Sequence, residues 1–211
     1  KMNSIENLKW RYAVKKFDEN KSLTETQINT LKEAFNLTAT SYGLQPVKMV
    51  VINNKDIQQE LVTHSWNQAQ VAQASHLLVL CIPKNYTQKE VDNYFELVKD
   101  IRNTPDEILN PFKEMLTGSI ASKTQEELTN WNKNQAYIAL GNLMTVAANE
   151  RIDSCPMEGF VPEKYDEILG LDKHNLTSVL VLPVGFRADD CFMKDLKKVR
   201  RKTEEVIIEL N

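Results

Sequence analysis

The sequence lacks the short motifs that mark several large classes of enzyme. It contains no Gly-x-Gly-x-x-Gly fingerprint and no Gly-Lys-Ser/Thr phosphate loop. It also lacks a Gly-x-Ser-x-Gly nucleophile elbow, and the histidines His64, His76 and His174 are isolated from one another. These absences argue against a Rossmann dehydrogenase, a P-loop enzyme, a zincin and an α/β-hydrolase. Any catalysis is therefore expected to depend on a bound cofactor rather than on a side-chain nucleophile.

The sequence also has few cysteines and no net positive charge, which argues against a metal site, a disulfide framework and bulk binding of nucleic acid. The cysteines Cys81, Cys155 and Cys191 are odd in number and lack metal-ligand spacing. We therefore predict no metal site and no disulfide framework, as in a protein of the reducing cytoplasm. The net charge of -3 argues against bulk binding of nucleic acid. No apolar run could span a bilayer and no signal peptide is recognisable, so we expect no membrane partner.

Internal repeats and low-complexity segments are absent as well, and the composition is that of an ordinary globular chain. The 211 residues are 42% hydrophobic and 26% charged, which fits one domain over residues 2–211 with a real core. Lys1 precedes Met2 and is expected to be a remnant of expression.

Helical and strand-like patterns alternate along the chain. Thr24–Gln27 and Thr124–Glu127 have the pattern of capping boxes, which predict helices to about Leu37 and about Arg151. The unbroken apolar run over 77–82 predicts a strand covered on both faces. These patterns predict an α+β or three-layer α/β fold with a small central sheet. The other expected elements are a first helix capped by Ser4, helices over Asp56–Thr63, Asn67–Gln73, Thr87–Arg102, Asp106–Leu116 and Pro162–Leu169, and strands over Lys48–Ile52, Ser178–Gly185 and Val206–Leu210.

Three features leave the outline open. Residues 103–123 combine the Asp106–Leu116 helix with a break at Thr117–Ser119, and we expect this segment to be mobile. The apolar Val206–Leu210 strand needs a sheet edge, its own or a partner's. The helix starting at Thr124 is about 40 Å long and apolar on two faces. It is therefore either the spine of the domain or half of a subunit interface.

Two basic clusters lie near the two ends of the sequence. The stretch Arg11–Asp18 places cations between bulky apolar residues, and Lys197–Lys202 is the second cluster. If Arg11 and Lys15 point into one cleft, they hold an anion, because Arg offers a planar fork for phosphate and Lys a mobile point charge. The alternative is a solvated basic edge on the surface.

Five motifs, in order along nearly the whole chain, resemble the FMN-dependent nitroreductase family. The resemblance is narrower to its oxygen-insensitive NAD(P)H nitroreductase and dihydropteridine reductase branch. Each motif is weak by itself, and it is their common order and spacing that carries the assignment. The motifs are Arg11–Asp18, the loop Thr40–Pro46, Ala74-Ser75-His76 before an apolar strand, Pro156–Phe160, and Pro183-Val184-Gly185 followed by Lys198 and Arg200.

The resemblance implies an α+β, three-layer α/β/α fold with a small mixed sheet and the long helix at a dimer interface. It further implies an obligate homodimer that binds two FMN molecules between its subunits, with residues 203–211 reaching the partner. NADH or NADPH would be the reductant. Side chains at the interface, such as Trp131 and Gln135, have plain packing roles as the alternative to flavin contact.

The resemblance also assigns the phosphate end of the flavin. Arg11, Lys198 and Arg200 would bind the FMN phosphate, which agrees with the argument from the basic clusters. Lys15 would lie near N1 and O2 of the ring, where a cation favours the anionic reduced flavin. Tyr12 and Ala13, which lie between Arg11 and Lys15, would also bind the cofactor. The family has Ser at position 13, so Ala13 leaves only a backbone contact.

Further contacts to the ring are implied on both sides of the dimer. Asn67 matches a polar contact to the ring edge. Gln70 stands where close relatives carry Lys, so the pyrimidine side of the ring, where Lys15 also lies, has one fewer charge, and the loss of that charge would lower the flavin potential. Thr40, Ser41 and Gly43 would come from the partner subunit, with Gly43 replacing an Asn.

The remaining implied site residues cover the ring and the acceptor. Pro156, Met157, Glu158 and Gly159 would cover one face of the ring, with the backbone N–H groups of Glu158 and Gly159 near N5 and O4. Cys155 is expected to be inert packing close to the ring. Phe112, Leu116 and Thr117 would line the substrate channel, with a mobile loop as the alternative.

The function implied is two-electron, ping-pong reduction of nitroaromatics, quinones or related electron-poor acceptors by NAD(P)H through FMN. One alternative is a non-catalytic flavin carrier or sensor, to which Ala13, Gly43 and Gln70 give weight. The other is a colourless protein whose basic clusters bind RNA or another polyanion.

Overall fold

The computed structural model describes residues 3–210, which contain four strands, nine α-helices and two 3-10 helices. The strands are β1 (Lys48–Ile52), β2 (His76–Pro83), β3 (Asp153–Ser154) and β4 (Leu176–Gly185). The helices are α1 (Ser4–Trp10), α2 (Glu25–Asn36), α3 (Lys55–Val62), α4 (Gln70–Gln73), α5 (Gln88–Arg102), α6 (Asp106–Ala121), α7 (Gln125–Asn149), α8 (Pro162–Ile168) and α9 (Thr203–Val206), with the 3-10 helices η1 (Ser41–Gly43) and η2 (Leu171–His174).

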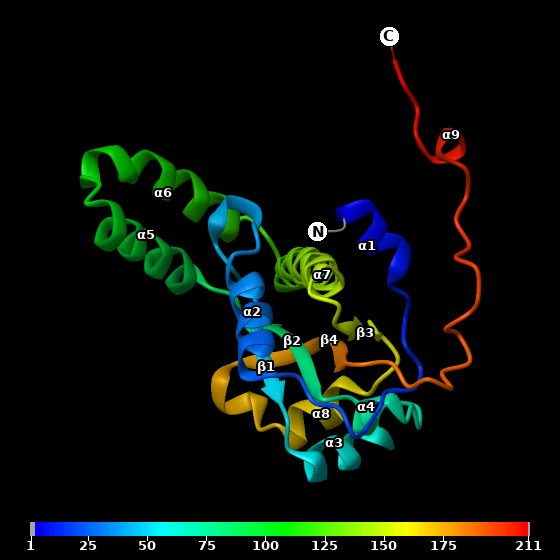
Figure 1. Cartoon of the computed structure of the whole chain (residues 1–211). Helices are drawn as coiled ribbons and strands as arrows, with labels where there is room; N and C mark the ends of the chain where they lie inside the picture. The colour runs from blue at the N-terminus through cyan, green and yellow to red at the C-terminus, as the bar shows by residue number, and fades with distance from the viewer. Residues whose placement is uncertain (1–2, 211) are drawn as a thin grey trace.

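The four strands form one sheet in the order β1-β2-β4-β3 at the centre of the molecule (Figure 1). All three pairings between these strands are antiparallel. The sheet is small and central, as expected. A mixed sheet was also expected, and the parallel component in the described residues is one isolated bridge between Ala13 and Ser154. The parallel contact arises because the segment after α1 runs alongside β3 without forming a ladder.

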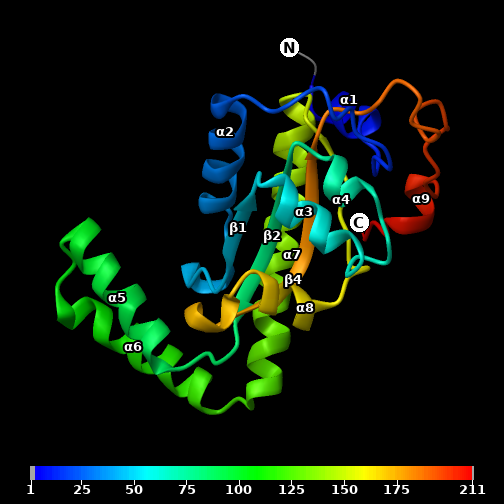
Figure 2. The ribbon, with the colours of Figure 1, turned by 90° about the horizontal axis from the view of Figure 1, so that it is seen from below.

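Strand β2 explains why the molecule has three layers. Its residues alternate between two buried clusters: Leu77 and Val79 lie in the first, and Leu78 and Leu80 in the second. Because successive side chains of a strand point to opposite faces, an unbroken apolar run must be covered on both sides. Helices α2 and α7 cover one face, and α3, α4 and α8 lie over the other (Figure 2). The predicted three-layer fold is confirmed.

Helices α5 and α6 form a hairpin that projects from the sheet (Figures 1 and 2). A third buried cluster, which includes Phe95, Leu116 and Leu128, joins this hairpin to the first turns of α7. The hairpin therefore has its own small core, and α7 is the element that links that core to the sheet.

The capping boxes predicted at Thr24 and Thr124 are both present. Each threonine side chain accepts a hydrogen bond from the backbone three residues later, so the helix starts were correctly predicted from local chemistry. At the first helix the prediction was wrong by one residue. Asn3, and not Ser4, is the cap, because its side chain accepts from the Glu6 N–H at 3.0 Å.

Three other local predictions were wrong. The break expected at Thr117–Ser119 is absent, since α6 continues to Ala121 and buries Leu116 and Ile120 on one face. Helix α4 starts at Gln70 rather than Asn67, whose positive φ of 56° is incompatible with a helix. The expected strand Val206–Leu210 is not formed: α9 ends at Val206 and the described residues after it are irregular. Residue 211 lies outside the described residues.

Among residues 3–210, no helix is both long and apolar enough to cross a bilayer.

Candidate active site

The segment after α1 is held along β3, and this contact sets the direction of its side chains. The Val14 N–H donates to the Ser154 carbonyl at 3.2 Å, beside the bridge formed by Ala13. Val14 and Phe17 are buried in the core beneath the sheet. Arg11 has extended backbone angles, with φ -70° and ψ 145°. The segment is therefore an irregular edge element that buries its apolar residues and leaves Arg11 and Lys15 less buried than the valine between them.

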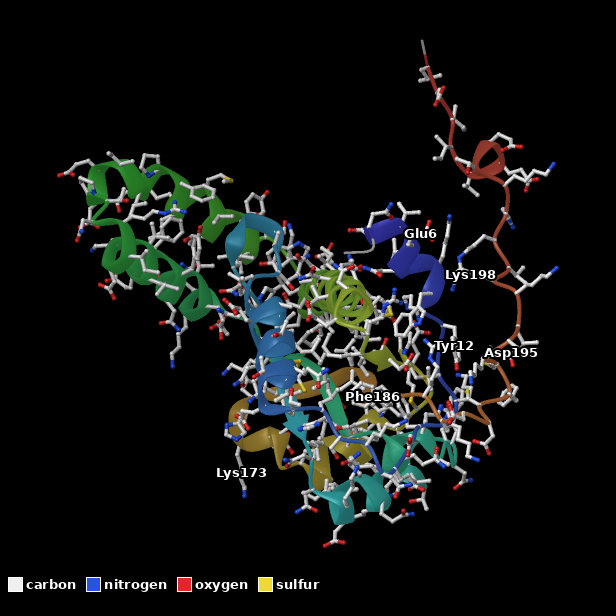
Figure 3. The ribbon with its side chains drawn as sticks, viewed as in Figure 1. Glu6, Tyr12, Lys173, Phe186, Asp195 and Lys198 are labelled. Carbon is white, nitrogen blue, oxygen red and sulfur yellow. The ribbon has the colours of Figure 1, made fainter. Side chains whose placement is uncertain are left out.

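A cavity of about 540 Å³ lies between this segment and the C-terminal tail, by which we mean the described residues 188–210 that follow Arg187. Figure 3 shows Lys198 on the tail, directed toward the segment that carries Tyr12. The Lys198 ammonium donates a hydrogen bond to the carbonyl of Arg11, 187 positions earlier in the chain. The predicted phosphate-binding cations are thus brought together. The lining residues are Lys9, Trp10, Arg11, Tyr12, Ala13, Pro156, Met193, Lys194, Leu196, Lys197, Lys198, Val199 and Arg200.

The charges in this cavity fit an anion. Arg11 Nε is buried without a hydrogen-bond partner among residues 3–210. Burial, followed by repulsion from Arg200, lowers the pKa of Arg11. Burial also lowers the pKa of Lys198, and Arg11 and Arg200 lower it further. Cations that repel one another around an unpaired guanidinium nitrogen would all be stabilised by a phosphate dianion, so these residues fit the phosphate of FMN.

Next to the cavity, two polar side chains converge on one thiol. Lys15 Nζ lies 3.5 Å from Cys155 Sγ, and Gln70 Nε2 lies 3.8 Å from the same sulfur. Cys155 directly precedes Pro156, which lines the cavity. The two side chains predicted for the pyrimidine side of the ring therefore lie together, adjacent to the predicted phosphate site. Cys155 is fully buried between them rather than remote packing.

Gln68 connects this cluster to the segment 156–160 and was missed by the sequence analysis. Its Oε1 accepts from Gln70 Nε2 at 2.9 Å, and its Nε2 donates to the Gly159 carbonyl at 3.1 Å. Asn67, one residue earlier, takes a left-handed conformation and donates its N–H to the Val62 carbonyl at 3.1 Å. No spacing or residue type distinguishes Gln68 from the other glutamines in the sequence, so its role only becomes visible through the tertiary contact.

The segment 156–160 is fixed by backbone pairing. Met157 exchanges hydrogen bonds with Val181 at 2.8 and 3.1 Å, and its side chain lies in the core. Glu158 is exposed, and its Oε1 accepts from the Tyr137 hydroxyl at 2.5 Å. At Gly159, a Cβ atom would lie 2.7 Å from the indole of Trp66, so only glycine fits without displacing that ring. Met157 therefore has its side chain in the core and its backbone N–H and carbonyl paired with Val181, so its predicted contact with the ring stays a prediction.

Other predicted residues lie elsewhere in the protomer, around η1. The Ser41 N–H donates to Gln135 Oε1 on α7 at 2.8 Å, and the Gln45 N–H donates to Thr40 Oγ1 at 3.0 Å. Gly43 has a positive φ of 75° and faces the Tyr94 hydroxyl, which would lie 3.2 Å from an added Cβ. Gln135 thus supports the loop, and its contact with the flavin stays a prediction.

The residues predicted to line a substrate channel are split by burial. Phe112 is exposed, and its ring centroid lies 6.2 Å from that of Tyr42 in η1. Leu116 is in the core, and Thr117 Oγ1 accepts from Gln88 Nε2 of α5 at 2.8 Å. A substrate role for all three stays a prediction, and the geometry favours Phe112. The mobility predicted for residues 103–123 also stays a prediction.

The predicted site residues therefore form two groups. We call Arg11, Lys15, Asn67, Gln70, residues 156–159, Lys198 and Arg200 the basic half-site. We call Thr40, Ser41, Gly43 and Phe112 the loop half-site. In the described part of the chain, no member of the loop half-site lines the cavity of the basic half-site. The segments that carry the two groups lie on opposite sides of α7 (Figure 1).

The chain is similar to known proteins both in sequence and in fold. The model of the nitroreductase family matches residues 8–186. A Staphylococcus haemolyticus protein, named as a candidate NAD(P)H nitroreductase, is 34% identical over 206 residues, which cover 94% of this chain and 93% of that protein.

Two solved structures show the same fold at low sequence identity. A candidate nitroreductase of Bacillus subtilis superposes with a TM-score of 0.86 at 18% identity, covering 98% of each chain. A candidate nitroreductase of Exiguobacterium sibiricum, solved in complex with FMN, gives a TM-score of 0.84 at 19% identity, covering 100% of this chain and 98% of that one. The family match and the staphylococcal relative confirm the resemblance found in the sequence motifs, and the chain belongs to the nitroreductase family.

Proposed function

We propose that this chain is an FMN-dependent NAD(P)H oxidoreductase that reduces electron-poor acceptors such as nitroaromatics and quinones. The observation that carries the proposal is the convergence of Arg11, Lys198 and Arg200 on one cavity, with Arg11 Nε buried and unpaired among residues 3–210. The staphylococcal relative is named for NAD(P)H nitroreductase activity, and the Exiguobacterium structure is a complex with FMN. Both relatives support the same cofactors here.

In this proposal each part of the basic half-site has one task. Arg11, Lys198 and Arg200 bind the phosphate, because three cations balance a dianion and offset the cost of its desolvation. When bound, FMN supplies two-electron hydride chemistry that the side chains themselves lack. Lys15 provides a positive charge at the pyrimidine side, where negative charge accumulates on reduction. The backbone of Glu158 and Gly159 offers N–H donors at the opposite edge.

We further propose that the active form is a homodimer in which the loop half-site of one subunit completes the basic half-site of the other. Within a protomer the two groups lie on opposite sides of α7, so neither is complete alone. Large apolar side chains are exposed on α1, on α7 and on the tail, as expected for a surface that a partner covers. They include Ile5, Leu8, Tyr137, Ile138, Ile208 and Leu210.

The proposal is tested by the visible spectrum of freshly purified protein, followed by anaerobic titration with NADH and NADPH. We expect a yellow protein with about one FMN per chain. The visible absorption band of the flavin should bleach on addition of NADH, of NADPH or of each of them, and it should return when a quinone or nitroaromatic is added. A protein that binds FMN without bleaching, or that does not bind FMN at all, would contradict the proposal.

Gln70 favours one second candidate, a flavin carrier or sensor without turnover. Its amide replaces a cation at the pyrimidine side, and both hydrogen bonds of its Nε2 are made within the protein. The same titration separates the two candidates, since a carrier binds FMN but turns over acceptors no faster than free flavin does. The polyanion hypothesis is not favoured, because the two basic clusters meet at a cavity and not along a continuous basic stripe.

A further inference from the structure

The guanidinium group of Arg187 lies between two aromatic rings that flank Arg11. Its central carbon is 4.2 Å from the ring centroid of Trp10 and 4.4 Å from that of Tyr12. Both distances are within the range of a cation–π contact, and the contact gains strength where water is excluded. Trp10 and Tyr12 also line the cavity of the basic half-site. Arg187 therefore stands behind the cavity wall that presents Arg11.

Asp153 fixes Arg187 in this position. Its carboxylate accepts from Arg187 Nε at 2.9 Å, from Nη2 at 2.5 Å and from the backbone N–H at 2.8 Å. The side chains of Arg187 and Asp153 are 18% and 4% exposed, respectively, so the pair is well shielded from solvent. Arg187 and Asp153 neutralise each other's charge. Arg187 therefore needs no further anion, unlike the three cations that line the cavity.

Backbone pairing joins the same segments. The Asp18 N–H donates to the Phe186 carbonyl at 2.8 Å, and the Ala188 N–H donates to the Lys16 carbonyl at 3.0 Å. Arg187 is thus in register with the segment that carries Arg11 and Lys15, and at the start of the tail that carries Lys198. A change in its position would move both walls of the cavity.

Resting on the proposed function, we propose that Arg187 is a positioning residue for the FMN phosphate, held by Asp153 and clamping Trp10 and Tyr12 so that Arg11 faces the cavity. It acts through these two rings and does not touch the cofactor. Arg187 should therefore affect only the binding of the phosphate end of the ligand. Riboflavin lacks the phosphate, so its dissociation constant should not depend on Arg187.

The test measures the dissociation constants of FMN and riboflavin for the full-length apoprotein by quenching of flavin fluorescence. In Arg187→Met we expect FMN binding to weaken about tenfold with riboflavin binding nearly unchanged. Arg187→Lys should recover part of the loss, because an ammonium can still lie over the rings. Lys84→Met is the matched control, because it also replaces an ion-paired cation by Met. It removes a surface ion pair with Asp172 that does not line the cavity, and it should change neither dissociation constant.

Asp153→Asn separates positioning from simple charge. Removing a negative charge near Arg11 should tighten FMN binding if only net charge matters, whereas loss of the clamp on Arg187 should weaken it. An unchanged ratio of the two constants in Arg187→Met, or tighter FMN binding in Asp153→Asn, would overturn the inference. If the wild-type protein itself shows no preference for FMN over riboflavin, the proposed function fails instead, so the two failures are distinguishable.

Discussion

The basic half-site and the loop half-site are built in different ways. In the basic half-site, segments from both ends of the chain are tied together by backbone pairing, by the Asp153–Arg187 ion pair and by the hydrogen bonds of Gln68. The loop half-site is held by the hydrogen bond from Ser41 to Gln135, by turn hydrogen bonds within residues 40–45 and by the aromatic contact of Tyr42 with Phe112. Strong charges need a rigid frame, because repelling cations separate unless the backbone holds them. The loop half-site contains no cluster of like charges, so it does not need so rigid a frame.

Complementation between subunits would break or confirm this division most clearly. Arg11→Met weakens the basic half-site and Ser41→Tyr fills the loop half-site, so each homodimer should have little activity at an FMN concentration that saturates only the intact site. In a heterodimer of the two variants, one site receives both defects and the other none, and about half of the wild-type activity should return. Differently tagged chains, co-expressed and purified through both tags, provide the sample. If the heterodimer is also inactive although it forms and folds, the half-sites do not combine across subunits.

The phosphate cations provide the next largest effect. Arg11→Met should weaken FMN binding about 30-fold, since charge-assisted hydrogen bonds to a phosphate are lost. Riboflavin binding should change little, which makes riboflavin the internal control. The two constants come from flavin fluorescence titrations at fixed ionic strength. Equal weakening for both ligands would mean that Arg11 supports the fold of the cavity and does not bind phosphate.

The loop half-site should respond more weakly to loss of its support. Gln135→Leu leaves the Ser41 N–H without its acceptor and should lower the free energy of unfolding by about 1 kcal/mol. Urea denaturation measures the change, with Lys133→Gln on the exposed side of α7 as a control expected to have almost no effect. A Gln135→Leu variant as stable as the control would show that the loop is held by contacts other than this one.

The smallest effect concerns pH. Burial, Arg11 and Arg200 lower the folded-state pKa of Lys198 from the usual 10.5. While Lys198 is charged, repulsion destabilises the folded state. Between the lowered pKa and 10.5 the unfolded chain binds more protons, so the stability contributed by this group rises with pH. The difference in urea midpoint between wild type and Lys198→Met should therefore narrow as the pH rises through that window, and phosphate should remove the effect.

Local chemistry predicted much of the fold. The capping boxes at Thr24 and Thr124 and the apolar run of β2 each specify their structure within a few residues, so neighbours in sequence are enough. The break predicted near Gly118 was wrong because burial of Leu116 and Ile120 on one face outweighs the low helix propensity of one glycine. The strand predicted at the C-terminus was wrong, because a strand needs a neighbouring strand to pair with and the described residues provide none for this segment.

The candidate site was predictable where the sequence carries basic clusters or repeats a family pattern. Arg11 and the Lys197–Lys202 cluster were anion-binding candidates from the residues themselves, the resemblance then assigned Arg11, Lys198 and Arg200 to the phosphate, and all three line one cavity. Gln68, Asp153 and Arg187 were not identified, since each acts across a long separation in sequence and none differs locally from surface residues of its type. Supports of this kind depend on which segments meet, and that information is carried by the whole fold.

The placement of Lys198 on an irregular tail has a consequence for handling the protein. A single protease cut in the exposed stretch near Phe192 and Leu196 would leave the sheet and its covering helices intact while separating from them Lys198 and Arg200, two of the three cations that we propose bind the phosphate. Such nicked material would still look folded by circular dichroism and yet lose its cofactor on dilution. The intact mass of a preparation with low flavin content should therefore be measured before the low content is attributed to weak binding by the uncut chain.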